Sequence, residues 1–360
     1  MKKILLATTV LGMSAGFAAA DVAVSGDARM GIASYNGDAA FSNRVRISFA
    51  GSGTTDGGLA FGGSVRADNS GAGAAGTDGS VFISGAFGKI TMGGVDSGDA
   101  AAVGQLSSVG YEGLGSGNSI GYSADGGLIG FGDNDIELTG TAARVLYTYS
   151  SGALTATASV SQIDNTEFVA PDTTGAVVGT TYTSSDYGVG SYGLGVSYNA
   201  GAVTVAAGYG VASGFNTTTT AANGADTYVE TESSITDMSA SVKFVSGDTT
   251  VKGIYQDKSA EQTTAGVSTE VWNAVSMGAS VDHKIDAVTV TAYTLTTTYS
   301  ADVLANDISL NRMGLGAAYD LGGGAAFKAG WSNIEVAVTD GSSTTSVSQD
   351  NFDAGLTFSF

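Results

Sequence analysis

The last ten residues of the sequence alternate strictly between apolar and small or polar side chains. Phe352, Ala354, Leu356, Phe358 and Phe360 fall on one side of an extended chain, and the intervening residues fall on the other. This period-two pattern predicts a strand with one apolar face. A soluble protein commonly follows its last strand with a frayed or charged tail. We therefore expect a membrane-inserted strand, with Phe358 and Phe360 as an insertion signal read by the barrel-assembly machinery.

The first twenty residues have the layout of an export signal. Lys2 and Lys3 form a positive region, residues 4–11 an apolar core, and Ala18 to Ala20 an A-x-A cleavage site. We expect a cleaved signal peptide over residues 1–20 and a mature chain over 21–360. An N-terminal membrane anchor is the weaker alternative, because the apolar run is short and no stop-transfer charges follow it. Export followed by membrane strands indicates the Gram-negative outer membrane.

The composition excludes several classes of protein. Cysteine is absent, which excludes disulfide frameworks and cysteine metal sites. Beyond the export signal no apolar run approaches the roughly 18 residues of a spanning helix. Charged residues make up 13% of the chain, against about 25% in a typical soluble domain. The net charge of −20 excludes nucleic-acid binding, and acidic loops would suit a lipopolysaccharide surface bridged by divalent cations.

Short alternating segments recur along the whole chain, and we count sixteen strands of about eight to twelve residues. Seven short turns carry Gly or Asp, and eight longer connections separate the hairpins. The longer connections are 34–42, 68–79, 94–141, 162–192, 212–235, 257–270, 299–309 and 333–350. This arrangement predicts an all-β, transmembrane, up-and-down antiparallel barrel with both termini on the short-turn side. A barrel of about 16 strands is wide enough for a water-filled lumen.

Four arginines fall on the polar side of the first three strands. A lipid-facing arginine at the bilayer midplane would cost about 2 to 4 kcal/mol, so we expect these side chains to face the lumen as a positive stripe. The plain alternative is scattered solubilising charge on a wet wall. The arginine stripe consists of Arg29, Arg44, Arg46 and Arg66.

The connection over residues 94–141 is the longest, and a long loop without periodicity is usually functional or disordered. It is acidic, and it contains no lysine or arginine, the next basic residue being Arg144. We expect this third loop to fold into the lumen as the constriction, where its carboxylates would oppose the arginine stripe. Screening over about 8 Å limits the resulting field to a weak bias in what passes. An ordinary surface loop is the alternative.

Several segments resemble the Rhodobacter-type general porins of Gram-negative outer membranes. They are SGDARMG (25–31), SGTTDGGL (52–59), FISGAFGKITMG (82–93), VGYEGL (109–114), VLYTYSSGAL (145–154), GLGAAYDLGGGA (314–325) and the terminal Phe360. The resemblance implies a homotrimer of sixteen-stranded barrels through which small hydrophilic solutes diffuse passively. It further implies loop acids facing the wall arginines across an eyelet, at Asp96, Asp99 and Glu112. No resident cofactor is expected, with calcium at acidic loops left open.

An enzymatic function is not expected. The only histidine, His283, lies beside a short turn at the periplasmic end, away from any loop acid that it could serve as a base. A different alternative is a secreted Gly/Thr/Asp-rich surface or adhesive β-protein without a pore. The absence of a GGxGxD repeat disfavours a calcium-stacked solenoid of that kind.

Overall fold

The computed structural model describes residues 21–68, 79–125, 144–161, 181–184, 190–220, 227–300, 306–340 and 343–360. The signal peptide expected at residues 1–20 lies outside them, as does the 126–141 part of the predicted third loop. The strands are β1 (Asp21–Tyr35), β2 (Asp38–Thr54), β3 (Ala60–Asp68), β4 (Ser80–Gly85), β5 (Gly88–Gly93), β6 (Arg144–Ser151), β7 (Leu154–Ser161), β8 (Thr181–Ser184), β9 (Gly190–Asn199), β10 (Val203–Thr220), β11 (Thr227–Ser246), β12 (Thr249–Thr264), β13 (Val267–Ile285), β14 (Val288–Ser300), β15 (Asn306–Gly322), β16 (Ala325–Asp340) and β17 (Ser343–Ser359). The helical turns are α1 (Gly98–Val103), η1 (Leu114–Ser116) and η2 (Ser123–Asp125). Among the described residues, none of the helices has the length and apolar character needed to cross a membrane.

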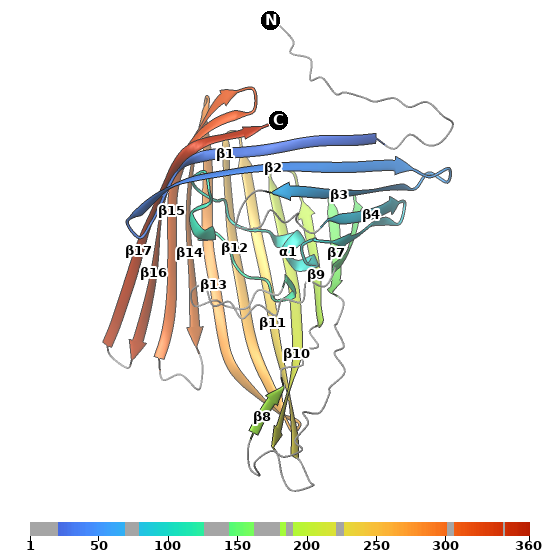
Figure 1. The fold of residues 1–360 in the computed structure, drawn as a ribbon, viewed down its shortest axis with the longest axis vertical. Helices are drawn as coiled ribbons and strands as arrows, with labels where there is room; N and C mark the ends of the chain where they lie inside the picture. Colours follow the sequence, from blue (N-terminus) through green and yellow to red (C-terminus); the bar gives the residue numbers. More distant parts are fainter. Residues whose placement is uncertain are drawn as a thin grey trace, which may run out of the picture.

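The strands form a closed antiparallel ring (Figure 1). Each ring strand pairs with the next one along the chain, β7 pairs with β9, and β17 pairs with β1 to close the sheet. The short β8 is additional, because it pairs only with the far end of β10, beyond the reach of β9. The described residues therefore contain sixteen ring strands, which confirms the predicted all-β barrel.

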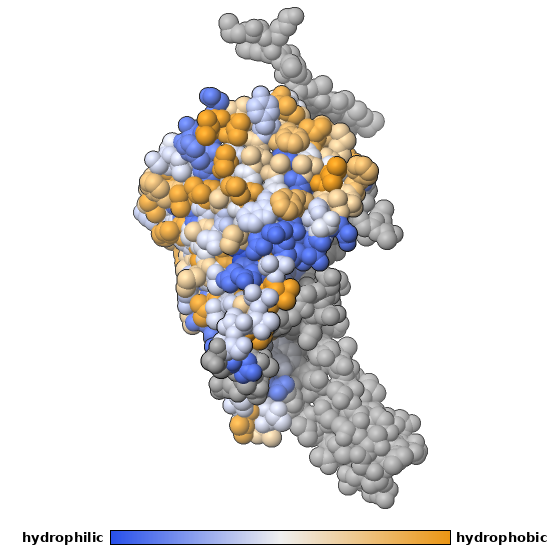
Figure 2. Space-filling model, turned by 90° about the vertical axis from the view of Figure 1, so that its left-hand side faces the viewer, coloured by the Kyte–Doolittle hydropathy of each residue, from blue (hydrophilic) through white to orange (hydrophobic). Residues whose placement is uncertain are grey.

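The alternation seen in the sequence separates an apolar outer face from a polar inner face. Met30, Phe49, Met238, Leu315 and Phe352 are all exposed, on the side of their strands that points away from the ring. Figure 2 shows apolar side chains gathered over the upper part of one side of the molecule, with a hydrophilic patch below them. Such an apolar surface is stable against lipid, whereas on a soluble protein it would be a liability.

Most predicted turns are confirmed, but several of the predicted long connections are wrong, because residues 212–235 and 333–350 lie largely within β10, β11, β16 and β17. Residues 34–42 reduce to the turn at Asn36 and Gly37, and residues 257–270 reduce to the turn at Ala265 and Gly266. All four turn residues have positive φ, between 51° and 92°, as in the turns that match strand twist. The strands continue past the lipid, where both faces meet water and the apolar alternation stops, although the backbones still pair. For this reason β10 and β11 reach 18 and 20 residues.

Candidate functional site

Residues 94–125, here called the inward segment, lie inside the ring, where Figure 1 shows α1. Their anchors are side chains on the inner face of the wall. Gly98 N–H donates to Ser159 Oγ on β7 (2.8 Å), and Lys252 Nζ on β12 donates to the Val103 carbonyl (2.6 Å). Further along, Arg312 Nη1 on β15 donates to the Ser119 carbonyl (2.9 Å). The segment thus crosses the lumen and is held on several strands.

Apolar packing fixes the middle of the inward segment. Val103, Leu106 and Tyr122 form a buried cluster with two wall residues, Ile254 and Leu295. Burial of such side chains stabilises the docked segment. We did not predict this contact from the sequence, although the sequence carries a signal for it, because Ile254 and Leu295 stand at positions where the lumen face should be polar.

Wall glycines let the inward segment approach the strands closely. A β-carbon at Gly195 would lie 2.3 Å from the Gly98 carbonyl oxygen, and one at Gly330 would lie 2.6 Å from the Gly110 backbone. Both distances are far below normal van der Waals contact. Only glycine allows the backbone of the inward segment to approach the wall this closely. The glycines of β9 and β16 therefore help to set how far the segment extends into the lumen.

The four residues of the arginine stripe stand together on the inner wall. Arg29 lies opposite Arg44 in the β1–β2 register, Arg46 lies opposite Asp68 on β3, and Ser48 lies opposite Arg66. Asp27 and Asp68, which we had not predicted as partners, form ion pairs within the stripe. The ion-pair distances are 2.9 Å from Arg44 Nη2 to Asp27, 2.6 Å from Arg46 Nε to Asp68 and 3.5 Å from Arg66 Nη2 to Asp68.

Of the three expected loop acids, Glu112 meets the arginine stripe. Its carboxylate lies 3.5 Å from Arg29 Nη2 and accepts a hydrogen bond from the Tyr35 hydroxyl (3.3 Å). The backbone N–H groups of Tyr111 and Glu112 donate to one carboxylate oxygen of Asp353 on β17, each at 2.9 Å. Asp353 is therefore the anchor for the far end of the inward segment, a role that we did not predict from the sequence.

The other two loop acids stand elsewhere. Asp96 is exposed. Asp99 is 0% exposed and lies against Gly208 and Gly210 of β10. The expectation that Asp99 faces the open lumen is therefore wrong: the first turn of α1 presents it to the wall. A segment without periodicity gives no indication of which side docks.

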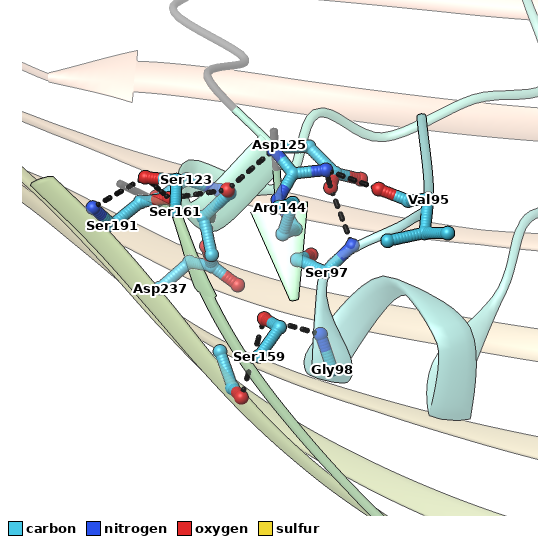
Figure 3. Close-up of polar contacts among 12 residues, drawn as sticks. Val95, Ser97, Gly98, Ser123, Asp125, Arg144, Ser159, Ser161, Ser191 and Asp237 are labelled. Carbon is cyan, nitrogen blue, oxygen red and sulfur yellow. Dashed lines mark hydrogen bonds and ion pairs between the residues drawn. The ribbon is translucent and has the colours of Figure 1, made fainter. Parts of the chain in front are cut away.

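A polar network holds the two ends of the inward segment, near Ser97 and near Asp125 (Figure 3). Asp125 forms an ion pair with Arg144 of β6 (2.9 Å) and accepts the Ser97 N–H (2.6 Å). Ser123 N–H donates to Asp237 of β11 (2.6 Å). These contacts join the two ends of the inward segment to each other and to the wall.

The polar groups of this lumen suit water and hydrated solutes. Within the described ranges, no three His, Asp or Glu side chains converge as a metal site would require. Calcium at acidic loops stays a prediction. Burial raises the pKa of the Tyr122 phenol, whose hydroxyl donates to the Gly104 carbonyl (2.6 Å). This side chain therefore acts as a neutral donor within the docked segment.

Comparison with known proteins agrees with this geometry. Residues 7–359 match the family described as Gram-negative porin. A porin from Rhodobacter capsulatus is 34% identical over 327 residues, which cover 89% of this chain and 96% of the relative. A porin structure refined at 1.8 Å resolution is 30% identical with a TM-score of 0.64, covering 94% of this chain and all of the other.

A trimer-form structure of Vibrio cholerae OmpT shows the same fold at 16% identity and a TM-score of 0.66, covering 95% of this chain and all of the other. The family match excludes the alternative of a pore-free adhesive protein. The chain belongs to the Gram-negative porin family and is a non-enzymatic channel for passive diffusion across the outer membrane.

Proposed function

We propose that the inward segment is the constriction of this channel, and that small hydrophilic solutes pass between it and the arginine stripe. The observation that carries this proposal is the crossing itself: wall contacts hold the segment from Ser159 on β7 to Asp353 on β17. A segment held so broadly narrows the lumen whenever it is docked. Passage then depends on solute size first.

The charge around the passage supports weak selectivity. The four arginines of the stripe contact three carboxylates, those of Asp27, Asp68 and Glu112. The opposing charges nearly balance, and screening over about 8 Å weakens what remains. The channel therefore biases the passage of ions and binds none of them tightly.

We further propose that the channel is a homotrimer in the membrane, surrounded by outer-membrane lipid and lipopolysaccharide. OmpT of Vibrio cholerae, which shares the fold, has been solved in a trimer form. The exposed apolar faces of β1 and β2, which carry Met30, Ile32 and Phe49, supply surface for lipid or for neighbouring subunits.

Planar-bilayer recording tests the pore and its width together. Detergent-folded protein should give conductance steps in groups of three, and sugars of graded size should reduce the conductance until they become too large to enter. Unheated protein should run as a trimer on a gel. An absence of conductance from folded protein would refute the pore, and single steps from a monomeric band would refute the trimer.

The C-terminal residue offers a test of the insertion signal. Gly26 N–H donates to the Phe360 carbonyl (2.7 Å) and Phe360 N–H donates to the Gly26 carbonyl (3.0 Å), so this residue completes the seam between β1 and β17. Removal of Phe360 should lower the yield of heat-modifiable barrel in the outer membrane. Phe327→Ala, a matched loss of a lipid-facing aromatic on β16, should assemble at nearly the normal yield. Equal yields for the two variants would contradict a special role of the terminus.

A further inference from the structure

A cluster of charged side chains is buried between the inward segment and the wall. Asp99 on α1, Asp237 on β11 and Lys258 on β12 are 0%, 1% and 3% exposed. A β-carbon at Gly210 would lie 2.5 Å from Asp99 Oδ2 and 2.8 Å from Asp237 Oδ1. The two carboxylates thus border the same small space, close enough to repel each other when both are ionised.

Asp99, Asp237 and the nearby Asp125 differ in the number of partners that their carboxylates have. Asp125 has its ion pair with Arg144. Asp237 accepts hydrogen bonds from Ser123 N–H (2.6 Å) and Gln256 Nε2 (3.2 Å), and it stands opposite Lys258 in the β11–β12 register. Figure 3 draws Asp125 and Asp237 together with Arg144, Ser97 and Ser123. By contrast, both carboxylate oxygens of Asp99 are buried and accept no well-formed hydrogen bond from any described residue.

The charges of this cluster do not balance. The carboxylates of Asp99, Asp125 and Asp237 share two cations, Arg144 and Lys258, and among the described residues Asp99 is the one for which the structure shows neither an ion pair nor a well-formed hydrogen bond. An ionised carboxylate buried without a donor is costly, and binding a proton removes that cost.

From this juxtaposition we propose that Asp99 is a proton-binding latch. Protonated Asp99 holds α1 against β10 and β11, whereas ionised Asp99 loosens the inward segment. The link from docking to conductance rests on the proposed function, since it requires that the inward segment is the constriction.

The groups that face Asp99 from the surrounding elements are few. β7 presents Ser159 and Thr157, and β9 and β10 present glycines. β11 adds Ser239 beside Asp237, and β12 adds Gln256 beside Lys258. The charged groups are therefore the five already named, with the exposed Asp96 acting on Asp125 from the rim of the cluster, and Tyr122 is a neutral donor. Burial raises the pKa of Asp125 as well, but the charge of Arg144 opposes that rise.

The direction of the pH effect follows from the surroundings of Asp99. Burial, with a smaller contribution from the charge of Asp237, raises the pKa of Asp99 from 3.8 to about 6. The neighbouring Ser97 hydroxyl and the backbone N–H of Asp99 itself oppose this rise in the pKa of Asp99 only in part. Because Asp99 binds its proton more tightly when the inward segment is docked, protonation of Asp99 stabilises the docked state below about pH 4. This stabilisation is lost as the pH rises through about 6. This difference between the pKa of docked and undocked Asp99 corresponds to a docking equilibrium constant that falls about a hundredfold on ionisation.

Two readouts on the same reconstituted protein test the latch between about pH 4 and pH 8. A nitroxide attached through Ala101→Cys reports the mobility of α1, because Ala101 is an exposed residue of that helix and the natural chain has no cysteine. Single-channel recording reports the constriction. We expect nitroxide mobility and current noise to rise together as the pH is raised from about 4 to about 6 and to level off above that. Asp99→Asn and Asp99→Ala, which cannot ionise, should keep both readouts low at all pH values.

Asp286→Asn, in the turn after β13, removes the same charge far from the loop and should retain the wild-type pH dependence. A common pH dependence in wild-type protein and both Asp99 variants would overturn the latch, and so would a wild-type nitroxide signal that is flat with pH. If nitroxide mobility follows Asp99 while the current does not, the latch stands and the assignment of the constriction fails.

Discussion

Replacing Arg44 and Arg46 together with Ala should shift the zero-current potential of the channel toward cations. At present four arginines of the stripe meet the carboxylates of Asp27, Asp68 and Glu112. The double variant leaves two arginines against the same three carboxylates, so the sign of the local charge reverses. A unit charge about 7 Å from a passing ion contributes about 0.6 kcal/mol in water. After screening, we expect the cation-to-anion permeability ratio to rise about fivefold.

The matched control is Arg44→Lys with Arg46→Lys, which preserves the charge but loses the forked guanidinium geometry. Its zero-current potential in a salt gradient should remain close to that of the wild type. Raising the salt concentration should shrink the effect of the alanine variant. An unchanged potential in the alanine variant would show that these two side chains lie outside the permeation path.

Replacing Gly330 with Val should displace the inward segment from the wall. A β-carbon there would lie 2.6 Å from the Gly110 backbone, and backbone atoms cannot rotate away as a side-chain tip can. Overpacking of this kind costs about 1 to 3 kcal/mol, so docking should weaken by about 5- to 150-fold. We expect higher single-channel conductance, more current noise and the passage of larger sugars.

Gly51→Val is the matched control, because a β-carbon at Gly51 meets nothing within 4 Å. This variant should keep the wild-type conductance and size limit. If Gly330→Val folded as a trimer but conducted like the wild type, the far end of the inward segment would not contribute to the constriction.

The sequence predicts the barrel well because lipid imposes a pattern on it. Every strand within the bilayer must present apolar residues to one side and polar residues to the other, so Val22 to Ile32 can be assigned without knowing their partners. Outside the bilayer that constraint ends. The long hairpins at Asn36 and Ala265 were missed for this reason.

The lumen is harder to predict than the wall. A polar residue on an inner face has the same pattern whether it lines water or holds a loop, so Asp353 and Arg312 were indistinguishable from other wet positions. Asp99 was misplaced because the inward segment has no repeat that would show which side docks. The arginines could be placed on one face, but their ion pairs with Asp68 depend on strand register, which the sequence alone does not set.

The seam between β1 and β17 has a consequence for biogenesis. The first strand of the ring finds its second partner only in the last, and that pairing runs from Asp27 with Ser359 to Tyr35 with Asn351. A polypeptide still being exported has two unsatisfied edges and cannot enclose water. We therefore expect the channel to conduct only after β17 has paired with β1.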